Sequence, residues 1–191
     1  MTTQTSRSDV FIAENFIQAH VCSELKAAAK QSTAVPAQVT KSTGRVDLDM
    51  RRTSRLFLPT EKEVQITSYL QKLKPQLETY FDLDLKGFEN FQFLMYREGD
   101  YYKRHADKND RIESPDYIKA RQVSLVIFLN NETPNEDPDG YEGGTLVIWT
   151  HGEALRVQGE TGKVIAFPSH LMHQVEPVKA RERYSIVSWY F

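Results

Sequence analysis

Cysteine is nearly absent from this sequence, because Cys22 is the single thiol among 191 residues. One thiol excludes an internal disulfide, and it excludes zinc sites built from four cysteines or from a cysteine pair and a histidine pair. Cys22 falls in a segment whose apolar residues recur at helical spacing. We therefore expect it to be an ordinary buried or half-buried side chain.

Long hydrophobic runs and an excess of one charge are also missing. No stretch of about 18 apolar residues is present to cross a membrane, and the polar start MTTQTSRSD lacks the apolar core of a signal peptide. The 24 basic and 26 acidic residues give a net charge of -2. This balance provides no driving force for binding nucleic acid or anionic membranes. We therefore expect a cytoplasmic protein with neither kind of partner.

What is present is typical of a globular protein. Hydrophobic residues make up 40% of the chain, charged residues 26% and aromatic residues 11%. The length predicts one domain over residues 1–191. Within it, residues 1–85 are expected to supply supporting helices and a loop, and residues 86–191 a β core.

The first part of the chain predicts two helices. Apolar residues recur every three or four positions at about 14–30 and at 61–81. Pro75 is expected to kink or split the second helix. Residues 31–55 are rich in Ser, Thr, Gln and Arg, and we expect them to form a long loop or a weak hairpin.

The pattern changes after Gly87. Turn residues separate six short runs that are rich in β-branched and aromatic residues: FENFQFLMY, VSLVIFL, GTLVIW, GKVIAF, HQVEPV and RYSIVSWYF. No long helical pattern interrupts them. This arrangement indicates an antiparallel sandwich or barrel, with the helices packed outside it.

His105 and Asp107 are the first candidate functional residues, in the segment DYYKRHAD. Alternation along a strand puts both side chains on one face, together with Tyr101 and Lys103, and turns Tyr102 to the other face. Neither face is apolar, which predicts that this strand end opens onto water or a cleft. By itself, a His-x-Asp pair is more often structural than functional.

His173 lies 66 residues beyond Asp107, in PSHLMHQVEPV. After the turn, alternation directs His173 inward together with Val175. Taken alone, an inward histidine is more often a hydrogen-bonded structural residue. His170 is a competing candidate within the turn.

Arg183 follows ten residues after His173 and begins the last strand. Alternation places it on one face with Ser185, Val187 and Trp189. A guanidinium beside such an inward stripe needs an anion, because burying an unpaired charge is costly. That anion is either an internal Asp or Glu or a bound ligand.

These separate features become specific when they are combined. Two histidines and one carboxylate on a β scaffold are the ligand set of non-haem Fe(II) oxygenases. Such a facial set leaves three positions open on an octahedral iron, two for a bidentate 2-oxo acid and one for dioxygen. The distal carboxylate of the acid then requires a fixed cation, which an arginine provides bidentately.

The chain resembles the Fe(II)/2-oxoglutarate-dependent dioxygenases, and within them the prolyl 4-hydroxylase and hypoxia-factor prolyl hydroxylase branch. The segments that carry the resemblance are ENFIQAHVCSEL, MYREGDYYKRHAD, VSLVIFLNN, EGGTLVIW, FPSHLMHQVEPV and RYSIVSWYF. The resemblance implies a double-stranded β-helix, or jelly roll, with supporting helices on one side. It also implies Fe(II), 2-oxoglutarate as co-substrate, and ascorbate as a further ligand of this branch.

The resemblance also implies roles for individual residues. It makes His105, Asp107 and His173 the iron ligands and Arg183 the partner of the 2-oxoglutarate C5 carboxylate. Three more residues would border the co-substrate: Ser185, Tyr96 and Trp189.

One position departs from the family pattern. Phe128 stands where the hypoxia-factor branch has a tyrosine that reaches the C5 carboxylate. Either Ser185, Ser124 or Tyr96 replaces that hydroxyl, or the pocket binds 2-oxoglutarate less tightly.

The implied reaction is hydroxylation of an unactivated C–H bond, with 2-oxoglutarate converted to succinate and CO2. Halogenases of the superfamily have Gly or Ala in place of the metal carboxylate, so Asp107 favours hydroxylation. The branch favours a peptidyl proline as substrate. The same chemistry on a free amino acid or small metabolite is one alternative, and a non-catalytic jelly-roll binding module is another.

Two polar segments are candidate substrate contacts. The loop 38–58 carries a set of basic residues that would close over a peptide: Arg45, Arg51, Arg52 and Arg55. The acidic insert 131–142 is expected at the same end of the barrel and carries Glu132, Glu136, Asp137 and Asp139. For both segments, a plain solvated loop is the alternative.

Overall fold

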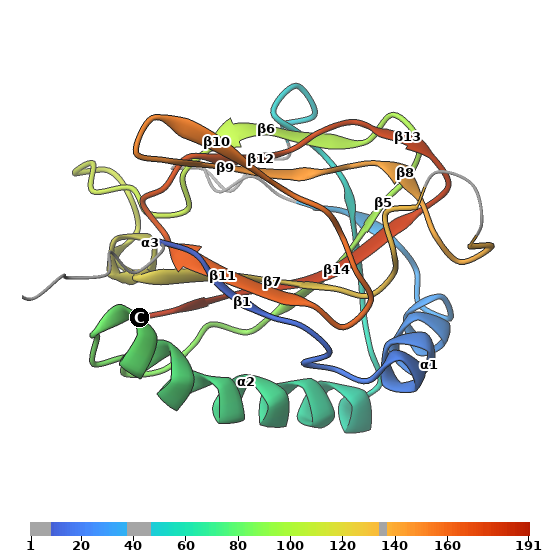
Figure 1. Ribbon diagram of the computed structural model, residues 1–191, viewed down its shortest axis with the longest axis horizontal. Coiled ribbons are helices and arrows are strands. Elements are labelled where there is room, and N and C mark those ends of the chain that lie inside the picture. Colours follow the sequence, from blue (N-terminus) through green and yellow to red (C-terminus); the bar gives the residue numbers. More distant parts are fainter. Residues whose placement is uncertain (1–8, 38–46, 134–136) are drawn as a thin grey trace, which may run out of the picture.

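The computed structural model describes residues 9–37, 47–133 and 137–191. Arg45 and Glu136 therefore lie outside the described residues. Two facing antiparallel sheets make up most of this part of the chain (Figure 1). They confirm the predicted jelly roll with its outer helices.

The larger sheet contains strands from both halves of the chain. Its order is β1 (Phe11–Ala13), β11 (Val164–Pro168), β7 (Val123–Phe128), β14 (Arg183–Tyr190), β5 (Gln92–Tyr96), β4 (Ser54–Leu56) and β2 (Val35–Pro36). The smaller sheet has the order β10 (Glu153–Val157), β9 (Leu146–Thr150), β12 (His173–Val175), β6 (Tyr101–His105) and β3 (Arg51–Arg52). A short pair joins β13 (Val178–Ala180) to β8 (Glu142–Gly143).

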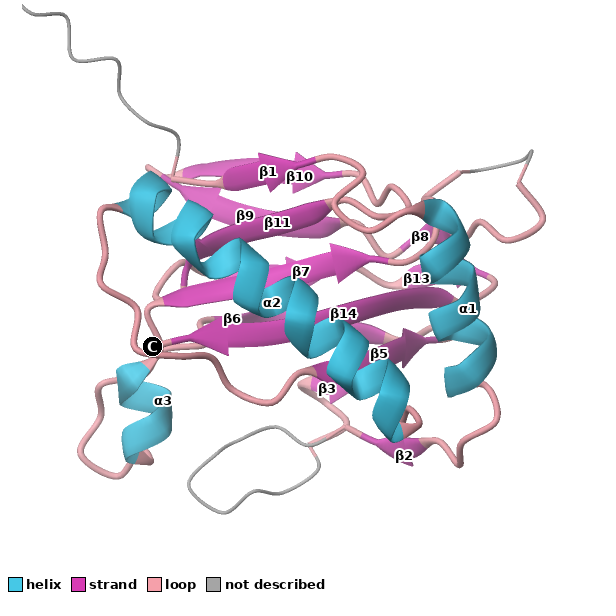
Figure 2. Cartoon of the chain, turned by 90° about the horizontal axis from the view of Figure 1, so that it is seen from below, coloured by secondary structure: helices cyan, strands magenta, loops and turns pink. Residues whose placement is uncertain are grey.

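Helices cover the outer face of the larger sheet. α2 (Thr60–Phe81) runs diagonally across it, and α1 (Ala19–Ala29) lies at one end (Figure 2). The buried side of α2 follows helical spacing, through Ile66, Leu70, Leu73 and Leu77. Pro75 lies inside α2 without splitting it. None of the helices in the described ranges is long and apolar enough to cross a membrane.

The N-terminal prediction was wrong in its boundaries. Residues 11–13 form β1, which pairs with β11, and the first helix begins only at Ala19. Residues 31–55 contain β2, β3 and the start of β4, so the first part of the chain supplies strands to both sheets. The polar insert after His105 also contains a short helix, α3 (Asp116–Ala120).

A close backbone contact ties the N-terminal segment to the sheet. The amide of Ile17 donates to the carbonyl of Gly162 over 3.1 Å. Gly162 has a φ of +80°, and a Cβ at this position would lie 1.9 Å from the Ile17 carbonyl oxygen. Only glycine allows both this backbone conformation and this approach.

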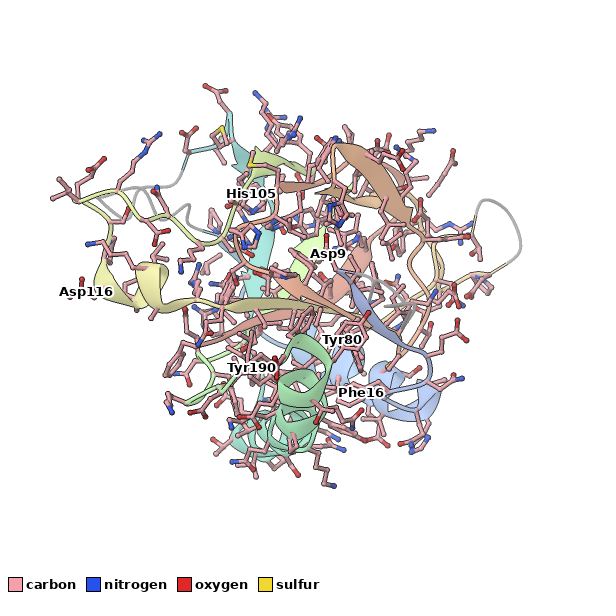
Figure 3. All side chains as sticks on the ribbon, turned by 60° about the vertical axis from the view of Figure 1, so that its left-hand side comes forward. Asp9, Phe16, Tyr80, His105, Asp116 and Tyr190 are labelled. Carbon is pink, nitrogen blue, oxygen red and sulfur yellow. The ribbon has the colours of Figure 1, made fainter. Side chains whose placement is uncertain are left out.

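β14 separates the interior into two environments. Tyr184, Ile186 and Tyr190 belong to the apolar core that the helices cover. The alternate residues of the strand face the smaller sheet, as predicted: Arg183, Ser185, Val187 and Trp189. Figure 3 shows Tyr190 and Tyr80 on the helix side of the larger sheet and His105 on its opposite side.

β6 does not follow the strict alternation predicted for it. His173 of β12 pairs with His105 of β6, and Val175 of β12 pairs with Tyr102 of β6. The two pairs are therefore two residues apart on β12 but three residues apart on β6. This shift in register is a β-bulge, which turns Tyr102 to the same side as His105. The two rings stack, with centroids 3.5 Å apart.

Candidate active site

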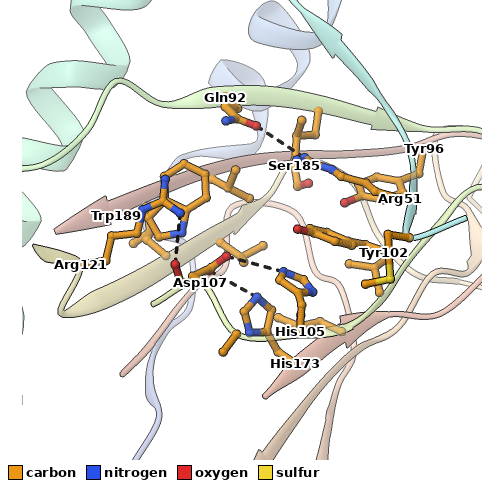
Figure 4. A pocket seen from close by; sticks show the side chains of 18 of the residues that line it. Arg51, Gln92, Tyr96, Tyr102, His105, Asp107, Arg121, His173, Ser185 and Trp189 are labelled. Atoms are coloured by element: carbon orange, nitrogen blue, oxygen red, sulfur yellow. Dashed lines mark hydrogen bonds and ion pairs between the residues drawn. The ribbon is translucent and has the colours of Figure 1, made fainter. Parts of the chain in front are cut away.

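A pocket opens between the two sheets and contains most of the predicted functional residues (Figure 4). Strands β5, β6, β12 and β14 supply much of its lining. The polar and aromatic residues of the lining include Arg51, Tyr96, Tyr102, His105, Asp107, Arg121, His173, Arg183, Ser185 and Trp189.

Three potential metal ligands meet at one end of this pocket. His105 and His173 lie opposite each other on β6 and β12, and Asp107 follows directly after β6. Asp107 Oδ1 is 3.5 Å from His105 Nε2, and its Oδ2 is 3.3 Å from His173 Nε2. One ligand atom from each residue lies within 4.8 Å of the others. This spacing allows all three side chains to bind one metal ion.

Backbone carbonyls orient both histidines. His105 Nδ1 lies 2.8 Å from the Lys103 oxygen, and His173 Nδ1 lies 3.0 Å from the Leu171 oxygen. Each Nδ1 can donate its proton to that oxygen, which leaves the Nε2 lone pair facing Asp107. A carbonyl on the far nitrogen is the usual way in which proteins fix a metal-binding histidine.

The ionisation of the three groups is strongly coupled. Burial and the neighbouring His173 lower the pKa of His105 to about 4, so its ring is neutral near pH 7. Burial also disfavours charge on His173, but the Asp107 carboxylate outweighs this and raises the pKa of His173. Burial opposes ionisation of Asp107 as well, yet both histidines hold the pKa of Asp107 well below its usual range. A charged carboxylate beside a neutral imidazole suits metal binding.

Further hydrogen bonds fix Asp107. Ser124 Oγ donates to Asp107 Oδ2 over 2.7 Å and lies 3.0 Å from Ser169 Oγ. The Asp107 amide donates to the Ser169 carbonyl over 3.0 Å. Arg121 Nη1 approaches the Asp107 carbonyl at 3.4 Å. Ser124 therefore holds the carboxylate, while Ser169 and Arg121 hold the backbone of Asp107.

Arg183 is the most unusual charged residue of the pocket. It is 1% exposed, and its Nη1 donates to Ser185 Oγ over 2.9 Å. Its Nε and Nη2 have no hydrogen-bond partner in the described part of the chain. The rings of Tyr96 and Phe128 lie 5.1 and 5.2 Å from its guanidinium carbon. Within the described residues no carboxylate forms an ion pair with it, which leaves the bound-ligand alternative.

The structure distinguishes among the other predicted residues. Tyr96, Ser185 and Trp189 all line the pocket, whereas His170 is exposed in the turn. Ser124 lies on β7 opposite Trp189, and Trp189 is six residues along β14 from Arg183. The Ser124 hydroxyl therefore lies away from Arg183 and donates to Asp107.

Cys22 is buried away from the pocket, as expected. It lies among the residues of the apolar core beneath the helices. Burial raises the pKa of its thiol to about 11. A thiol with such a pKa stays protonated and unreactive near neutral pH.

Tyr102 and Arg121 line the pocket although no functional role was predicted for them, whereas Arg51 was predicted only as one member of a basic loop. Tyr102 reaches the pocket because of the bulge in β6. Arg121 forms a bidentate ion pair with Glu89 and stacks on Trp189 at 3.8 Å. Arg51 lies over the Tyr102 ring at 4.8 Å. The two arginines belong to polar segments whose fold local periodicity does not reveal.

The basic loop contributes unequally to the pocket. Arg51 is buried and lines it, whereas Arg52 is exposed and lies over the ring of Tyr101. Arg55 lies over Phe57, outside the lining. Of the basic residues predicted to clamp a substrate, Arg51 alone among the described ones reaches the pocket.

The acidic insert is partly anchored to the rest of the molecule. Asp139 pairs with the buried Lys26 of α1, and Glu132 accepts a hydrogen bond from Thr145. No described residue of the insert belongs to the lining of the pocket. These contacts are those of an ordered connection rather than of a freely solvated loop.

A family profile described as the 2OG-Fe(II) oxygenase superfamily matches residues 91–191. A PKHD-type hydroxylase from Alteromonas mediterranea is 37% identical over 99 residues, which are 51% of this chain and 41% of the relative. A PKHD-type hydroxylase from Thermosynechococcus vestitus is 37% identical over 97 residues, 51% of this chain and 40% of the relative. The similar segment thus spans about two fifths of these curated relatives.

Solved structures with a similar fold include two prolyl hydroxylases. A prolyl-4-hydroxylase from Pseudomonas putida superposes with a TM-score of 0.74 at 23% identity, covering 95% of this chain and 91% of the other. A Trichoplax adhaerens prolyl hydroxylase, solved with a peptide fragment of hypoxia-inducible factor, also gives 0.74 at 20% identity, covering 96% and 83%. At these identities the likeness establishes the fold.

Proposed function

The chain belongs to the 2OG-Fe(II) oxygenase superfamily, and from that premise we propose that it hydroxylates an unactivated C–H bond with Fe(II) and 2-oxoglutarate. In this reaction R–H, O2 and 2-oxoglutarate give R–OH, succinate and CO2. The observation that carries the proposal is one pocket that holds both a compact His-Asp-His cluster and a buried, incompletely bonded arginine.

The donor set fits Fe(II). Two imidazole nitrogens and one carboxylate are the ligands that non-haem Fe(II) oxygenases use, and they leave coordination positions open. We assign His105, Asp107 and His173 as these ligands. The bound metal would supply oxygen activation beside the substrate. The chain's own part is to hold three donors in place, through the carbonyls of Lys103 and Leu171 and the hydroxyl of Ser124.

Arg183 fits the distal carboxylate of 2-oxoglutarate. An unpaired guanidinium that is almost completely buried is costly, and a carboxylate would satisfy its remaining N–H groups. Ser185 supports Arg183 from the same strand face. Tyr96 and Trp189 would form apolar walls that exclude water from the co-substrate.

The proposed substrate is a peptidyl proline. The PKHD-type relatives are named as hydroxylases, and one structural neighbour was solved with a peptide of hypoxia-inducible factor. Arg51 and Gln92, whose side chains are 3.5 Å apart, offer polar groups to a peptide backbone at the pocket. The alternative substrate is a free amino acid or a small metabolite. Failure of peptides as substrates would favour it.

Anaerobic titration of the apoprotein with Fe(II) and then 2-oxoglutarate tests the cofactor assignment. We expect a visible metal-to-ligand charge-transfer band, because bidentate binding of the keto acid to iron produces one. Succinate formation and a mass gain of one oxygen on substrate then test the reaction. If the band does not appear, the chain is better described as a jelly-roll binding module without this chemistry.

The substrate assignment is tested by a matched pair of arginine variants. Arg51→Gln should raise KM for a peptide substrate with little change in kcat, because it removes a contact made before and during the reaction. Arg52→Gln should leave KM unchanged, since Arg52 lies outside the pocket. Equal KM values for wild type and both variants would reject a role of Arg51 in substrate binding.

Three finer expectations complete the proposal. We propose that residues 1–191 act as one catalytic domain, because the helices of the first part pack on the sheet that carries Arg183. Ascorbate is proposed as a reductant that sustains turnover, and its omission from the assay should lower the yield of succinate. A cytoplasmic location is likewise proposed.

A further inference from the structure

Tyr141 is a second buried group with an incomplete set of hydrogen bonds, and it lies beside Arg183 without lining the pocket itself. The residue is 1% exposed, and its hydroxyl has no hydrogen-bond partner in the described ranges. Buried tyrosine hydroxyls normally find a partner, so such a group calls for an explanation. Tyr141 comes directly before β8, in the segment YEGG, and had no predicted role.

The surroundings of two glycines show that Tyr141 lies close to both Arg183 and Phe128. A Cβ at Gly144 would lie 3.0 Å from Arg183 Cδ and 3.4 Å from Tyr141 Cε2, so both side chains flank this glycine. A Cβ at Gly159 would lie 2.0 Å from the Tyr141 hydroxyl and 3.0 Å from Phe128 Cδ1. The hydroxyl therefore sits beside the Phe128 ring, which itself lies against Arg183.

The charge of Arg183 reaches the Tyr141 hydroxyl. Burial raises the pKa of Tyr141 to about 12, and the nearby Arg183 partly opposes this rise. The phenol thus remains protonated near neutral pH and is available as a donor. Arg183 opposes the rise both through its charge and as a close polar neighbour of the hydroxyl, but neither its Nε nor its Nη2 is aligned for a hydrogen bond with Tyr141.

A second arginine in the pocket shows which kind of group the Nε and Nη2 donors of Arg183 would bind. Arg121 uses its Nε and Nη2 to hold both carboxylate oxygens of Glu89, at 2.5 and 2.7 Å. The same two nitrogens of Arg183 are the ones without a partner. Arg183 therefore presents an empty carboxylate-binding fork, and Tyr141 adds a third donor beside it.

We propose that Tyr141 donates a hydrogen bond to the distal carboxylate of 2-oxoglutarate while Arg183 binds that carboxylate bidentately. This inference rests on the proposed function and adds a residue to it. Phe128, at the end of β7, has no hydroxyl where the hypoxia-factor branch has a tyrosine. Tyr141, in the connection before β8, would supply that hydroxyl. Ser124 donates its proton to Asp107 and does not take this place. Ser185 accepts from Arg183 Nη1 and therefore supports the guanidinium directly.

The test compares Tyr141→Phe with wild type by anaerobic titration of the Fe(II)-loaded proteins, followed through the charge-transfer band. We expect the variant to bind 2-oxoglutarate about ten- to a hundredfold more weakly, because it loses one hydrogen bond to a charged group. Binding of 2-oxopentanoate, which lacks the distal carboxylate, should be equal in both proteins. A Tyr184→Phe variant, altered on the helix side of β14, should bind both acids like wild type.

Gly159→Ala provides a second variant that keeps the tyrosine. Its methyl group would occupy the position of the hydroxyl, so 2-oxoglutarate should again bind more weakly and 2-oxopentanoate should not. The proposal is overturned if both variants bind 2-oxoglutarate within twofold of wild type. It is also overturned if both lose the same factor with 2-oxopentanoate, since the defect would then be structural.

Wild-type titration separates this inference from the proposed function. If wild type binds Fe(II) but gives no charge-transfer band with 2-oxoglutarate, the proposed function fails whatever the variants do. If wild type gives the band and the two variants bind like it, the cofactor assignment stands and only the role of Tyr141 is rejected.

Discussion

The two faces of β14 differ in how completely their polar groups are satisfied. On the helix side, the Tyr190 hydroxyl donates to the Leu70 carbonyl over 2.8 Å, and Ser188 Oγ donates to the Glu89 carbonyl over the same distance. On the pocket side, Arg183 retains two buried nitrogens without partners. Adjacent residues of one strand therefore face two different environments. On the helix side these hydroxyls have partners, and on the pocket side two donors of Arg183 have none in the described part of the chain.

The two faces of β14 therefore have different roles. The apolar side chains under α2 provide stability, since burial of apolar surface is the dominant favourable contribution to folding. The pocket side carries a destabilising charge, which the proposed function explains, because a cation must be in place there before the carboxylate of the ligand arrives. Variants on the helix side should consequently change stability, and variants on the pocket side should change metal or ligand binding. Four variants, two of them on β14, test this separation.

The largest effect is expected on the pocket side from Asp107→Ala. Loss of one of three metal ligands should reduce Fe(II)-dependent succinate formation to the background of the assay. The melting temperature should change little, because the two histidines can then remain neutral. Asp110→Ala, at an exposed position nearby, is the control. Full turnover by Asp107→Ala would remove this residue from the ligand set.

Arg183→Met should weaken 2-oxoglutarate binding by about thirtyfold to several thousandfold, as for truncation of one partner in a buried ion pair. Without ligand, the same variant should melt at a higher temperature than wild type, because an unpaired buried charge is removed. Calorimetry and thermal unfolding measure the two effects. A lower melting temperature would mean that the guanidinium already contributes to stability in the free protein.

Ile186→Ala should show the opposite behaviour on the helix side. Ile186 is fully buried, and such truncations cost about 2–5 kcal/mol, or roughly 4–20 °C of melting temperature in a protein of this size. Its affinity for 2-oxoglutarate should equal that of wild type. Val187→Ala, one residue along but on the pocket side, should lower stability less. If Ile186→Ala alters ligand affinity, the two faces are coupled.

The smallest effect is expected from Ser124→Ala, which removes the hydrogen bond to Asp107 Oδ2. Partners of metal ligands typically contribute about ten- to a hundredfold in metal affinity. Competition with a chelator would measure the loss of Fe(II) affinity. Ser188→Ala deletes a similar hydroxyl on the other face of the larger sheet and should leave metal affinity unchanged.

The regular strands were predictable from the sequence. Arg183, Ser185 and Trp189 face the pocket because β14 is eight residues long and alternates without interruption. Such predictions hold best where one backbone conformation persists over many residues. Alternation also directed His173 inward correctly, although β12 has only three residues.

Local irregularities explain most of the misses. The bulge in β6 brings Tyr102 beside His105, and a bulge adds a residue without any clear mark in the pattern. The strands β2 and β3 have only two residues each, too few to show a period. β1 has only three residues and was not predicted, and the helix predicted over about 14–30 began too early, because apolar residues at helical spacing continue upstream of Ala19.

Tyr141 and Arg51 illustrate a different limit. Tyr141 reaches the interior from the connection before β8 and Arg51 from the two-residue strand β3. Their positions therefore depend on tertiary packing and not on local propensity. The glycines at 143 and 144, with φ of +71° and +66°, were the available signal near Tyr141. They indicate an unusual backbone conformation, but they do not reveal which side chain it brings to Arg183.

If Arg183 binds 2-oxoglutarate as proposed, its unsatisfied fork also links the lifetime of the protein to its metabolite supply. A ligand that binds only the folded state stabilises it, by about 2.7 kcal/mol when its concentration is a hundred times its dissociation constant. Depletion of 2-oxoglutarate would therefore increase the population of opened molecules that a protease can cut. Pulse proteolysis at rising co-substrate concentration should show slower digestion of wild type and no such protection of Arg183→Met.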